Sequence, residues 1–540
     1  MTLFTDNVEG HVDIAFSAKS YKVPAGKIVS LNLQLWTWGY EGTLVFSVNS
    51  QKTPDDVFEA FQEMKPIKLT FSLQAGLDEE QEDTLIPLDI EAWVYEKAIE
   101  EEGSQESRYI DRVIIRYYTL HFKDPARLFW RQHHLEKLYI DSDLKTIINE
   151  QVVEQISVTC DGPFLEKKHK QILVSVGLRT KNQASFYDYI IWLVKENNGL
   201  FYYDYTKKSY VISEKAPKSE QNMDLSLQSL HNYKVIFPEI SYSDYKIQNA
   251  YVKDSSAEKG ENENKIAPLT QDFIGIWDLP ANFKDSATLF QSIHTQEQPS
   301  IQFNFRKIPL EICVPWNTVK CIEKQWSKGA YPTGKKYIVR SMSLEINSKK
   351  EGMEDYLNKK KIFECHCHVL AQSPEELTYQ YPSYIKPEYP LQVEGEVFSD
   401  QGEEENLTYN MVEDSDTSVK YYEVEIPVFE KLKVRVPYLP VNMNGQFYFP
   451  PYKKQQVLLA IWHYTSDIIS YLDWRKNAPL AMDTQGNQIV LGQSEKNRTT
   501  IKHSYADNKP QLEINRLLEK DTQTITLGEG IIILHTKEDK

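Results

Sequence analysis

SFYDYIIWLVKENNGLFYYDYTKKSYVIS, residues 185–213, is the stretch that decides the fold of this chain. Ser185 can cap a helix, and Asp188, three residues further on, can return the contact as the carboxylate of a capping box. Gly199 is expected to end the helix in a left-handed conformation. Apolar side chains recur between them at helical spacing and predict one buried stripe: Phe186, Tyr189, Ile190, Leu193 and Val194. Residues 200–205 and 209–213 read as two strands, so the stretch predicts a core helix packed against an aromatic hairpin.

The composition is that of a large, acidic chain. With 540 residues it is too long for one hydrophobic core, and two to four domains are expected. Hydrophobic residues make up 41% of it, yet no run approaches the roughly 18 apolar residues of a membrane span. The first residues, MTLFTDNVEG, lack the pattern of a secretory signal. We therefore expect a soluble protein that is made in the cytoplasm.

Charge and cysteine content exclude two classes of protein. The net charge of −17 argues against nucleic acid as the main partner, because nucleic-acid binding needs a basic surface. The 5 cysteines are an odd number without repeating spacing, which argues against a disulfide framework. The 33 tyrosines, together with runs of Thr, Val and Ile, indicate many half-buried strands. The chain is predicted to be predominantly β.

The N-terminal third has the alternation of half-buried strands. Strands are predicted at residues 12–16, 28–35, 42–48 and 67–73, with a short helix at residues 54–63. Two acidic runs, residues 78–83 and 100–106, are expected to be solvated loops. Residues 108–128 read as a long strand closed by Asp124 and Pro125, and a further helix is expected from residue 144 to about residue 153.

Three segments carry motifs in an order that points to one family. The first motif lies on Arg116, Tyr118, Leu120, Pro125, Leu128, Arg131, Thr146 and Ile147, and the second on Ile190, Val194, Glu196, Gly199, Leu200 and Tyr202. The third lies on Phe363, Pro374, Tyr381, Pro382, Pro387 and Pro390. Together they resemble the hub of VgrG proteins, the spikes of type VI secretion systems, although the arginine of the family's "Y-R-P-P" element is absent. The repeated prolines favour an extended linker after the hub.

Residues 421–475 are predicted to form a small closed barrel. Strands of period two are expected at residues 421–429, 430–439, 445–464 and 467–475, as in an oligonucleotide/oligosaccharide-binding (OB) barrel. The corresponding VgrG domain is similar at Lys433 to Pro437, Phe449, Pro450, Val457 to Ile461, Asp467 and Ile469. The glycine that follows the proline in the family, and its "GDPDRP" turn, are missing here, which leaves the shapes of the turns open.

The last 60 or so residues predict a different kind of sheet. Short strands are expected at residues 488–491, 498–505, 511–517, 522–527 and 531–536. A sheet of five short strands leaves bare edges, which promote aggregation, whereas three chains wound together would close every edge. The resemblance to VgrG and phage spikes likewise implies an intertwined trimeric β-helix.

Few residues suggest a reactive site. Cys365, His366, Cys367 and His368 form the most suggestive cluster, but alternation along one strand would place thiols and imidazoles on opposite faces and prevent a tetrahedral zinc site. His133 and His134 have the same problem. No carboxylate pair, phosphate-binding loop or nucleophile motif is apparent. We therefore predict no enzyme, no cofactor and no metal.

The predicted fold is mainly β with an α+β hub. It comprises a phage-tail-hub-like region of two barrel-like domains at residues 1–390, an OB-fold barrel with its linker at residues 391–477, and a C-terminal intertwined trimeric β-helix needle at residues 478–540. The resemblance implies a homotrimeric spike and baseplate hub of a contractile injection system. Such a protein caps the hexameric inner tube, anchors the baseplate and punctures the target envelope when the sheath contracts.

The partners implied are the inner-tube protein, baseplate proteins and a PAAR-type tip protein. The tip protein is expected to stack on the end of the needle, at Ile531, Ile533 and His535, where the needle ends at Lys540 without a fused effector. Assembly in the cytoplasm would precede secretion or ejection of the particle toward the target cell envelope. Two alternatives remain open: a cell-wall-degrading baseplate enzyme, and a carbohydrate-binding adhesin that uses Trp36 and Trp38 or Trp462 and Trp474. For Trp36 and Trp38, core packing is the competing interpretation.

Overall fold

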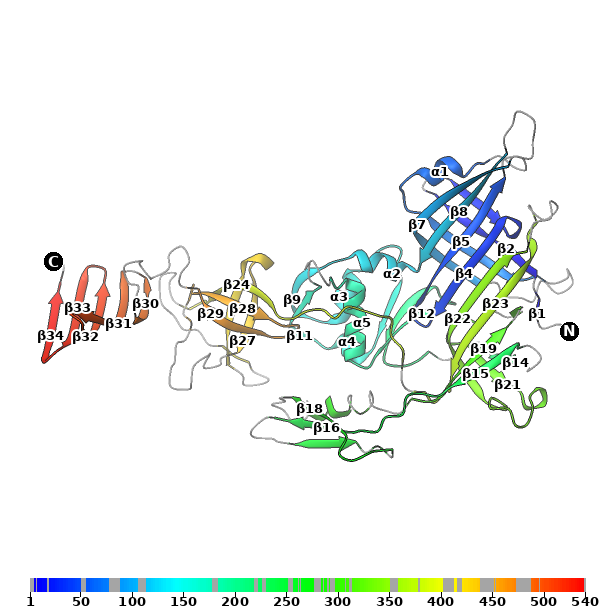
Figure 1. The fold of residues 1–540 in the computed structure, drawn as a ribbon. Helices are drawn as coiled ribbons and strands as arrows, with labels where there is room; N and C mark the ends of the chain where they lie inside the picture. The colour runs from blue at the N-terminus through cyan, green and yellow to red at the C-terminus, as the bar shows by residue number, and fades with distance from the viewer. Residues whose placement is uncertain are drawn as a thin grey trace. The chain divides into compact units, whose positions relative to one another are not determined.

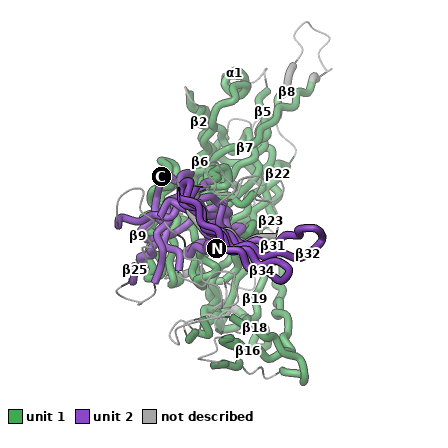
Figure 2. Tube along the Cα trace, turned by 90° about the vertical axis from the view of Figure 1, so that its left-hand side faces the viewer, with its two compact units in different colours: residues 1–134, 145–166, 178–386 green, residues 135–144, 167–177, 387–540 purple. Residues whose placement is uncertain are grey.

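The computed structural model describes most of the chain. The described residues are 4–5, 7–16, 19–49, 55–76, 88–104, 113–176, 183–217, 222–225, 230–250, 256–260, 262, 264–275, 283–284, 286–288, 291, 297–305, 307–309, 313–349, 358–376, 379–401, 412–414, 420–437, 451, 453–472, 487–494 and 496–538. They form two compact units (Figures 1 and 2). Unit 1 comprises residues 1–134, 145–166 and 178–386, and unit 2 comprises residues 135–144, 167–177 and 387–540. The predicted mainly-β fold class is confirmed.

Unit 1 contains a closed β-barrel. Its strands are β2 (Asn7–Ala15), β4 (Ile28–Trp36), β5 (Gly39–Asn49), β6 (Lys68–Ala75), β7 (Leu88–Ser104), β8 (Val113–Lys123), β22 (Lys336–Ser348) and β23 (Lys360–Gln372). The ring closes because β22 pairs with β4 on one side and with β23 on the other. The four strands predicted in residues 12–73 are all present. Alternation turns the apolar residues of the barrel strands inward, so that Phe46, Phe71 and Phe122 are fully buried.

The same two long strands carry a second sheet region. At its C-terminal end β23 pairs with β19 (Ser300–Phe305), which pairs with β15 (Asn232–Ile236). At its N-terminal end β22 pairs with β21 (Thr318–Cys321), which runs parallel to β14 (Asn222–Leu225). Strands β22 and β23 are therefore shared between the barrel and this second region (Figure 1).

One acidic run differs from its prediction. Residues 78–83 lie outside the described residues, but residues 100–104 belong to β7 and not to a solvated loop. Strand β7 continues antiparallel to β8, with Glu101 opposite Arg116, and the Arg116 Nε donates a hydrogen bond of 2.7 Å to the Glu101 carboxylate. Pairing with a strand that supplies a cation outweighs the low strand propensity of glutamate.

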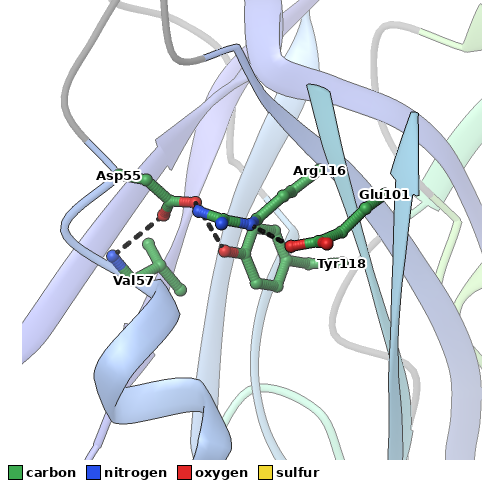
Figure 3. Close-up of polar contacts among 5 residues, drawn as sticks. All are labelled: Asp55, Val57, Glu101, Arg116 and Tyr118. Atoms are coloured by element: carbon green, nitrogen blue, oxygen red, sulfur yellow. Dashed lines mark hydrogen bonds and ion pairs between the residues drawn. The ribbon is translucent and has the colours of Figure 1, made fainter. Parts of the chain in front are cut away.

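A short helix, α1 (Phe58–Gln62), is held by a satisfied polar cluster (Figure 3). The Asp55 carboxylate accepts hydrogen bonds from Arg116 at 2.7 Å, from the Tyr118 hydroxyl at 2.8 Å and from the Val57 amide at 3.3 Å. Partial burial opposes the charge on Arg116, but its bonds to Asp55 and Glu101 outweigh that effect and raise its pKa. Because the Asp55 carboxylate accepts three hydrogen bonds from within the protein, we interpret this cluster as stabilising the fold rather than binding a ligand.

Residues 185–213 fold largely as the sequence predicts. Helix α5 (Phe186–Glu196) begins with a complete capping box between Ser185 and Asp188, and its apolar stripe is buried. The expectation for Gly199 is wrong. The left-handed residue is Asn198, with φ +49°, and the amides of Asn198 and Gly199 donate to the carbonyls of Lys195 and Val194. Asn tolerates the left-handed region, so no glycine is needed there.

Gly199 instead occupies a tightly packed position. A Cβ atom at this position would lie 3.3 Å from the Phe164 ring. The predicted hairpin follows as β12 (Leu200–Asp204) and β13 (Ser209–Ser213), and β13 also runs parallel to β10 (Val158–Asp161). The proline-rich linker lies along this helix and hairpin: Tyr381 donates a hydrogen bond of 2.6 Å to the Gly199 carbonyl, and Asp188 accepts one from the Ile385 amide.

The long strand ends at Asp124, as predicted. Asp124 caps α2 (Pro125–Phe129), and its buried carboxylate accepts hydrogen bonds from the Tyr40 amide and from the Tyr210 hydroxyl of the hairpin. Burial raises the pKa of Asp124, although Arg127 and Tyr210 favour its charged form. This residue therefore ties the barrel to the 200–213 hairpin within unit 1.

Unit 2 is built around a barrel-like sheet. Its strands are β24 (Leu391–Phe398), β25 (Val412–Glu413), β26 (Lys420–Ile426), β27 (Leu432–Pro437), β28 (Gln456–Ile461) and β29 (Ser466–Tyr471). Two strands from much earlier in the chain, β9 (Glu136–Ser142) and β11 (His169–Ser175), pair with each other and join this unit. The assignment as an OB fold, and the boundaries at residues 390 and 477, stay predictions.

The remaining elements complete the chain. The C-terminal part is a sheet of β30 (Asn487–Ser494), β31 (Asn497–Ala506), β32 (Lys509–Leu518), β33 (Asp521–Gly528) and β34 (Ile531–Lys537). A separate three-stranded sheet holds β16 (Asp244–Asn249), β17 (Ala257–Gly260) and β18 (Thr270–Gly275). The others are β1 (Phe4–Thr5), β3 (Ser20–Pro24), η1 (Ala25–Lys27), η3 (Trp130–Gln132), α3 (Leu144–Glu150), α4 (Pro163–Glu166), β20 (Ile308–Pro309), η5 (Glu323–Gln325) and η6 (Pro427–Phe429). Within the described residues, no helix has the length and apolar character needed to cross a membrane.

Candidate functional site: the C-terminal sheet

The C-terminal sheet is a meander in which each strand turns directly into the next. Every neighbouring pair from β30 to β34 is antiparallel. Asp507 and Asn508 both have positive φ, at +52° and +64°, which is the conformation of the tight hairpin turns that match strand twist. Gly530, at +71°, serves the last turn. All five strands predicted for this part of the chain are therefore present.

One face of this sheet carries a continuous row of aliphatic side chains. Residues directly opposite each other in a ladder point to the same face, and the register aligns five of them across the sheet: Ile489, Ile501, Ile514, Ile525 and Leu534. Leu512, Leu527 and Ile532 form a second row on the same face. We call these eight residues the aliphatic face.

The opposite face is mainly polar. It presents the row Lys502, Glu513, Thr526 and Ile533 and the row Thr500, Asn515, Thr524 and His535. The Asn515 side chain donates a hydrogen bond of 3.2 Å to the Thr524 hydroxyl on this face. The sheet therefore has the two-sided pattern of a layer that is covered on one side and solvated on the other.

The aliphatic face is uncovered in the single chain. Leu534 is 75% exposed and Ile532 is 71% exposed. Complete burial of one such side chain is worth about 1.5–3 kcal/mol, so a partner that covers the rows would gain several times that amount. In the described part of the chain, β34 pairs with β33 alone and β30 with β31 alone, which leaves both outer edges of the sheet open.

The residues predicted to dock a tip protein lie on the last strand, but not on the aliphatic face. Ile531, Ile533 and His535 point to the polar side, and they alternate with Ile532 and Leu534 of the aliphatic face. Ile531 is 58% exposed and Ile533 is 49% exposed. The exposed apolar residues of β34 thus fall into two sets on opposite faces, and only Ile531 and Ile533 belong to the predicted tip-protein site.

The cysteine and histidine cluster is divided as alternation predicts. On β23, Cys365 and Cys367 are buried, whereas His366 and His368 are exposed. His368 is bonded to the Asn304 side chain at 2.7 Å, and burial raises the pKa of the Cys367 thiol. Across the residues that the structure describes, no group of three or more His, Cys, Asp or Glu side chains is arranged to hold a metal ion.

The other histidines and tryptophans that the sequence singled out have separate places. The rings of His133 and His134 are bonded to the Gln151 side chain and the Ala184 carbonyl. The rings of Trp36 and Trp38 stack at 5.9 Å and are both half-buried, although Trp38 lies in the turn after β4. Trp462 is 42% exposed, and Trp474 lies outside the described residues.

The fold is shared with solved structures across almost the whole chain. One is a chain of the lidless PdpA–VgrG complex, with 12% sequence identity, full coverage of both chains and a TM-score of 0.70. Another is a chain of the half-lidded Francisella PdpA–VgrG complex, with 13% identity, coverage of 98% of this chain and 88% of that one, and a TM-score of 0.70. A third is from the lidded Francisella complex, with 13% identity, coverage of 100% and 81%, and a TM-score of 0.71.

These likenesses establish the fold. The predicted VgrG-like architecture is confirmed at that level, because the similarity covers 100% of this chain. No family model matches the sequence. No curated protein matches it either. Identities of 12–13% therefore leave the activity to be argued from the chain's own residues.

Proposed function

We propose that this chain is the trimeric spike and hub of a contractile injection system. In this role it caps the inner tube, anchors the baseplate and punctures the target envelope when the sheath contracts. The observation that carries the proposal is the uncovered aliphatic face of a single-layered sheet. The fold shared with chains of PdpA–VgrG complexes supports it along the rest of the sequence.

A single-layered sheet of this kind needs partners. Isolated sheets are stable only when a hydrophobic face is packed, and here five of the eight side chains of that face are exposed, with Ile525 at 40%. Two copies face to face would cover the rows but leave four open edges. Three copies arranged around an axis, with their aliphatic faces inward, cover the rows and bring each open edge next to a neighbour.

Such an assembly has the mechanical properties of a spike. Its backbone groups are paired within and between strands, and its apolar side chains lie along the axis, away from water. Opening it would require the separation of three chains at once, which gives kinetic stability. In this arrangement the polar face, with Lys502, Glu513 and Thr526, is the outer surface.

The tip-protein site follows from the same arrangement. With Ile532 and Leu534 turned inward, Ile531, Ile533 and His535 form the outward surface of the last strand. A PAAR-type tip protein can bind there by covering the exposed Ile531 and Ile533 side chains. The hexameric tube protein and the baseplate proteins would contact the hub, as the resemblance to VgrG implies.

Localisation in assembled particles tests the function directly. The full-length chain would carry a small epitope tag within residues 402–411, and intact and contracted particles from the native organism would be examined by immunogold electron microscopy. We expect label at one end of each inner tube, and loss of tubes when the gene is deleted. Particles without label, or a tagged chain that never sediments with tubes, would contradict the proposal.

The enzyme and adhesin alternatives are tested separately. Clearing of peptidoglycan by the purified chain in a zymogram would support the cell-wall enzyme, and saturable binding on a glycan array would support the adhesin. We expect neither result. The stacked Trp36 and Trp38 rings are half-buried, which leaves little aromatic surface for a sugar to cover.

A further inference from the structure

The pair of strands β9 and β11 is built into the core of unit 2. We call this pair the ribbon. Leu138 of β9 and Leu173 of β11 are opposite each other, at 2% and 0% exposure, and they belong to the same apolar cluster as Val424, Val434, Leu459 and Ile468 of the barrel-like sheet. The ribbon therefore completes the core of a sheet that lies more than 200 residues further along the chain.

Polar contacts fix the ribbon to one turn of that sheet. The turn between β28 and β29, residues 462–465, is closed by a bond from the Trp462 amide to the Thr465 carbonyl. The Leu173 amide donates a hydrogen bond of 2.9 Å to the His463 carbonyl, and the Gln171 side chain donates one of 2.7 Å to the buried Ser466 hydroxyl. Both bonds join β11 to the turn or to the strand that follows it.

Two histidine rings contact the same tyrosine ring at this junction. The His169 ring of β11 is stacked on the Tyr464 ring at 4.0 Å with an interplanar angle of 11°. The His463 ring lies 4.0 Å from the same Tyr464 ring, and Tyr389 lies 5.6 Å from His463. His463 is 9% exposed and His169 is partly buried. A buried site that holds two imidazoles close together tolerates them best when both are neutral.

We propose that this junction is an acid-sensitive latch, in which protonation of His463 and His169 releases the ribbon from the 462–465 turn. The electrostatics favour that direction. Burial, and then the nearby His169, lower the pKa of His463 to about 3, and burial and Lys167 lower the pKa of His169. Both shifts mean that the docked state holds these rings neutral.

The sign of the pH dependence follows from these shifts. An undocked histidine has a pKa of about 6.5, so it gains a proton below that pH while the docked ring stays neutral. The free energy of docking the ribbon on the turn is therefore most favourable at pH 7.5, and it becomes less favourable as the pH falls below about 6.5. For His463 alone the equilibrium shifts toward the open state by about tenfold for each further pH unit, until the pH approaches its docked pKa.

Charged groups of both signs lie on the elements packed around the junction. Asp141 is paired with Lys170 at 3.5 Å, and Glu136 acts on Tyr389. Other charged or titratable groups on these elements are Lys167, Lys168 and Lys170 around His169, Lys137 and Tyr139 on β9, Tyr464 in the turn, and Asp467 and Tyr471 on β29. Burial also raises the pKa of Tyr464 to about 12, so it stays neutral over the whole range.

Release of the ribbon has a consequence for the connection between the units. The chain passes between unit 1 and unit 2 at 134–135, 144–145, 166–167, 177–178 and 386–387, and the ribbon accounts for all but the last of these crossings. With the latch closed, the ribbon is part of the core of the barrel-like sheet, so all five crossings lead into that sheet. With the latch open, the chain enters the sheet only at 386–387. This device does not rest on the proposed spike function.

Hydrogen exchange on the full-length chain tests the latch. Exchange of peptides covering residues 135–144 and 167–177 would be measured at pH 7.5 and 5.0 and corrected for the intrinsic pH dependence. We expect the opening equilibrium of these peptides to rise about 30-fold or more at pH 5.0, while peptides from residues 185–213 keep their protection. Equal protection at both pH values, or equal loss in both regions, would overturn the proposal.

Two variants sharpen the result. His463→Phe keeps an aromatic ring at the junction but cannot be protonated, so the ribbon should keep most of its protection at pH 5.0. The control, His366→Gln, removes an exposed histidine from β23 and should behave as the wild type does. A ribbon that opens at pH 5.0 as readily in His463→Phe as in the wild type would contradict the assignment. The wild-type profile stands as a test even if His463→Phe does not fold.

Discussion

Ile525 on β33 lies directly opposite Leu534 on β34, and both side chains point to the same uncovered face of the C-terminal sheet. Their exposed fractions are 40% and 75%. Their neighbours on β34, Ile533 and His535, point to the other face. One strand therefore presents two different surfaces, which we assign to contacts between copies of this chain and to a tip protein.

The two faces of β34 can be separated by matched substitutions. Leu534→Asp places a charge on the face that we expect to be buried between copies, so the assembly should dissociate or lose its resistance to denaturant. Ile533→Asp introduces the same charge one residue away on the outer face. It should leave the assembly intact and abolish binding of a tip protein. Solution mass and a pull-down with the tip protein measure the two effects, and identical behaviour of the variants would contradict the assignment.

The capping box of α5 should contribute measurably to hub stability. Ser185→Ala removes the hydroxyl that accepts from the Asp188 amide, and it is expected to lower the free energy of unfolding by about 1 kcal/mol. The control Ser20→Ala alters an exposed serine at the start of β3 and should change stability by less than about 0.5 kcal/mol. Chemical denaturation followed by tryptophan fluorescence would compare the two, and equal stabilities would argue against the cap.

Gly39 should tolerate no side chain. Its φ is +142°, and a Cβ atom there would lie 2.5 Å from the Asp124 carboxylate. Gly39→Ala should therefore destabilise the hub by at least about 2 kcal/mol, because it strains the backbone and displaces a buried carboxylate. Gly329→Ala, where no atom lies within 4 Å, is the control and should change little. Thermal unfolding of the two variants gives the comparison, and a neutral Gly39→Ala would contradict the described geometry.

The cluster around Asp55 gives a fourth test. Asp55→Asn removes the charge that Arg116 and Tyr118 share and should cost about 1.5–3 kcal/mol, since hydrogen bonds to charged groups are strong where they are partly buried. Glu101→Gln removes the second partner of Arg116, but this side chain is 50% exposed, so its loss should cost under about 1 kcal/mol. Equal costs would mean that burial does not distinguish the two pairs.

Local signals allowed much of the fold to be predicted. Ser185 and Asp188 define a helix start that tertiary structure did not change, and the alternation in residues 488–536 defines the strands of the C-terminal sheet. The alternation on β23 also correctly placed Cys365 and Cys367 on one face and His366 and His368 on the other. These features depend on neighbours a few residues away, which a single sequence contains.

Non-local pairing could not be predicted in the same way. Nothing in residues 136–142 and 169–175 indicates that Leu138 and Leu173 fill a core formed by residues 397–468, because alternation shows which face is buried but not against what. Glu100 and Glu101 were expected in a loop for the same reason: their partners on β8 were not apparent. The left-handed conformation expected at Gly199 occurs one residue earlier, at Asn198, because asparagine also tolerates it.

The mass of the full-length chain in solution tests the central claim most directly. Light scattering on the purified protein should give three times 63.0 kDa, and this mass should persist in moderate denaturant. Ile525→Lys, on the aliphatic face, should reduce the mass to that of one chain, whereas Thr526→Lys, on the polar face next to Glu513, should leave it unchanged. A wild-type chain that is monomeric at micromolar concentration, or a trimer that Ile525→Lys does not disturb, would contradict the account.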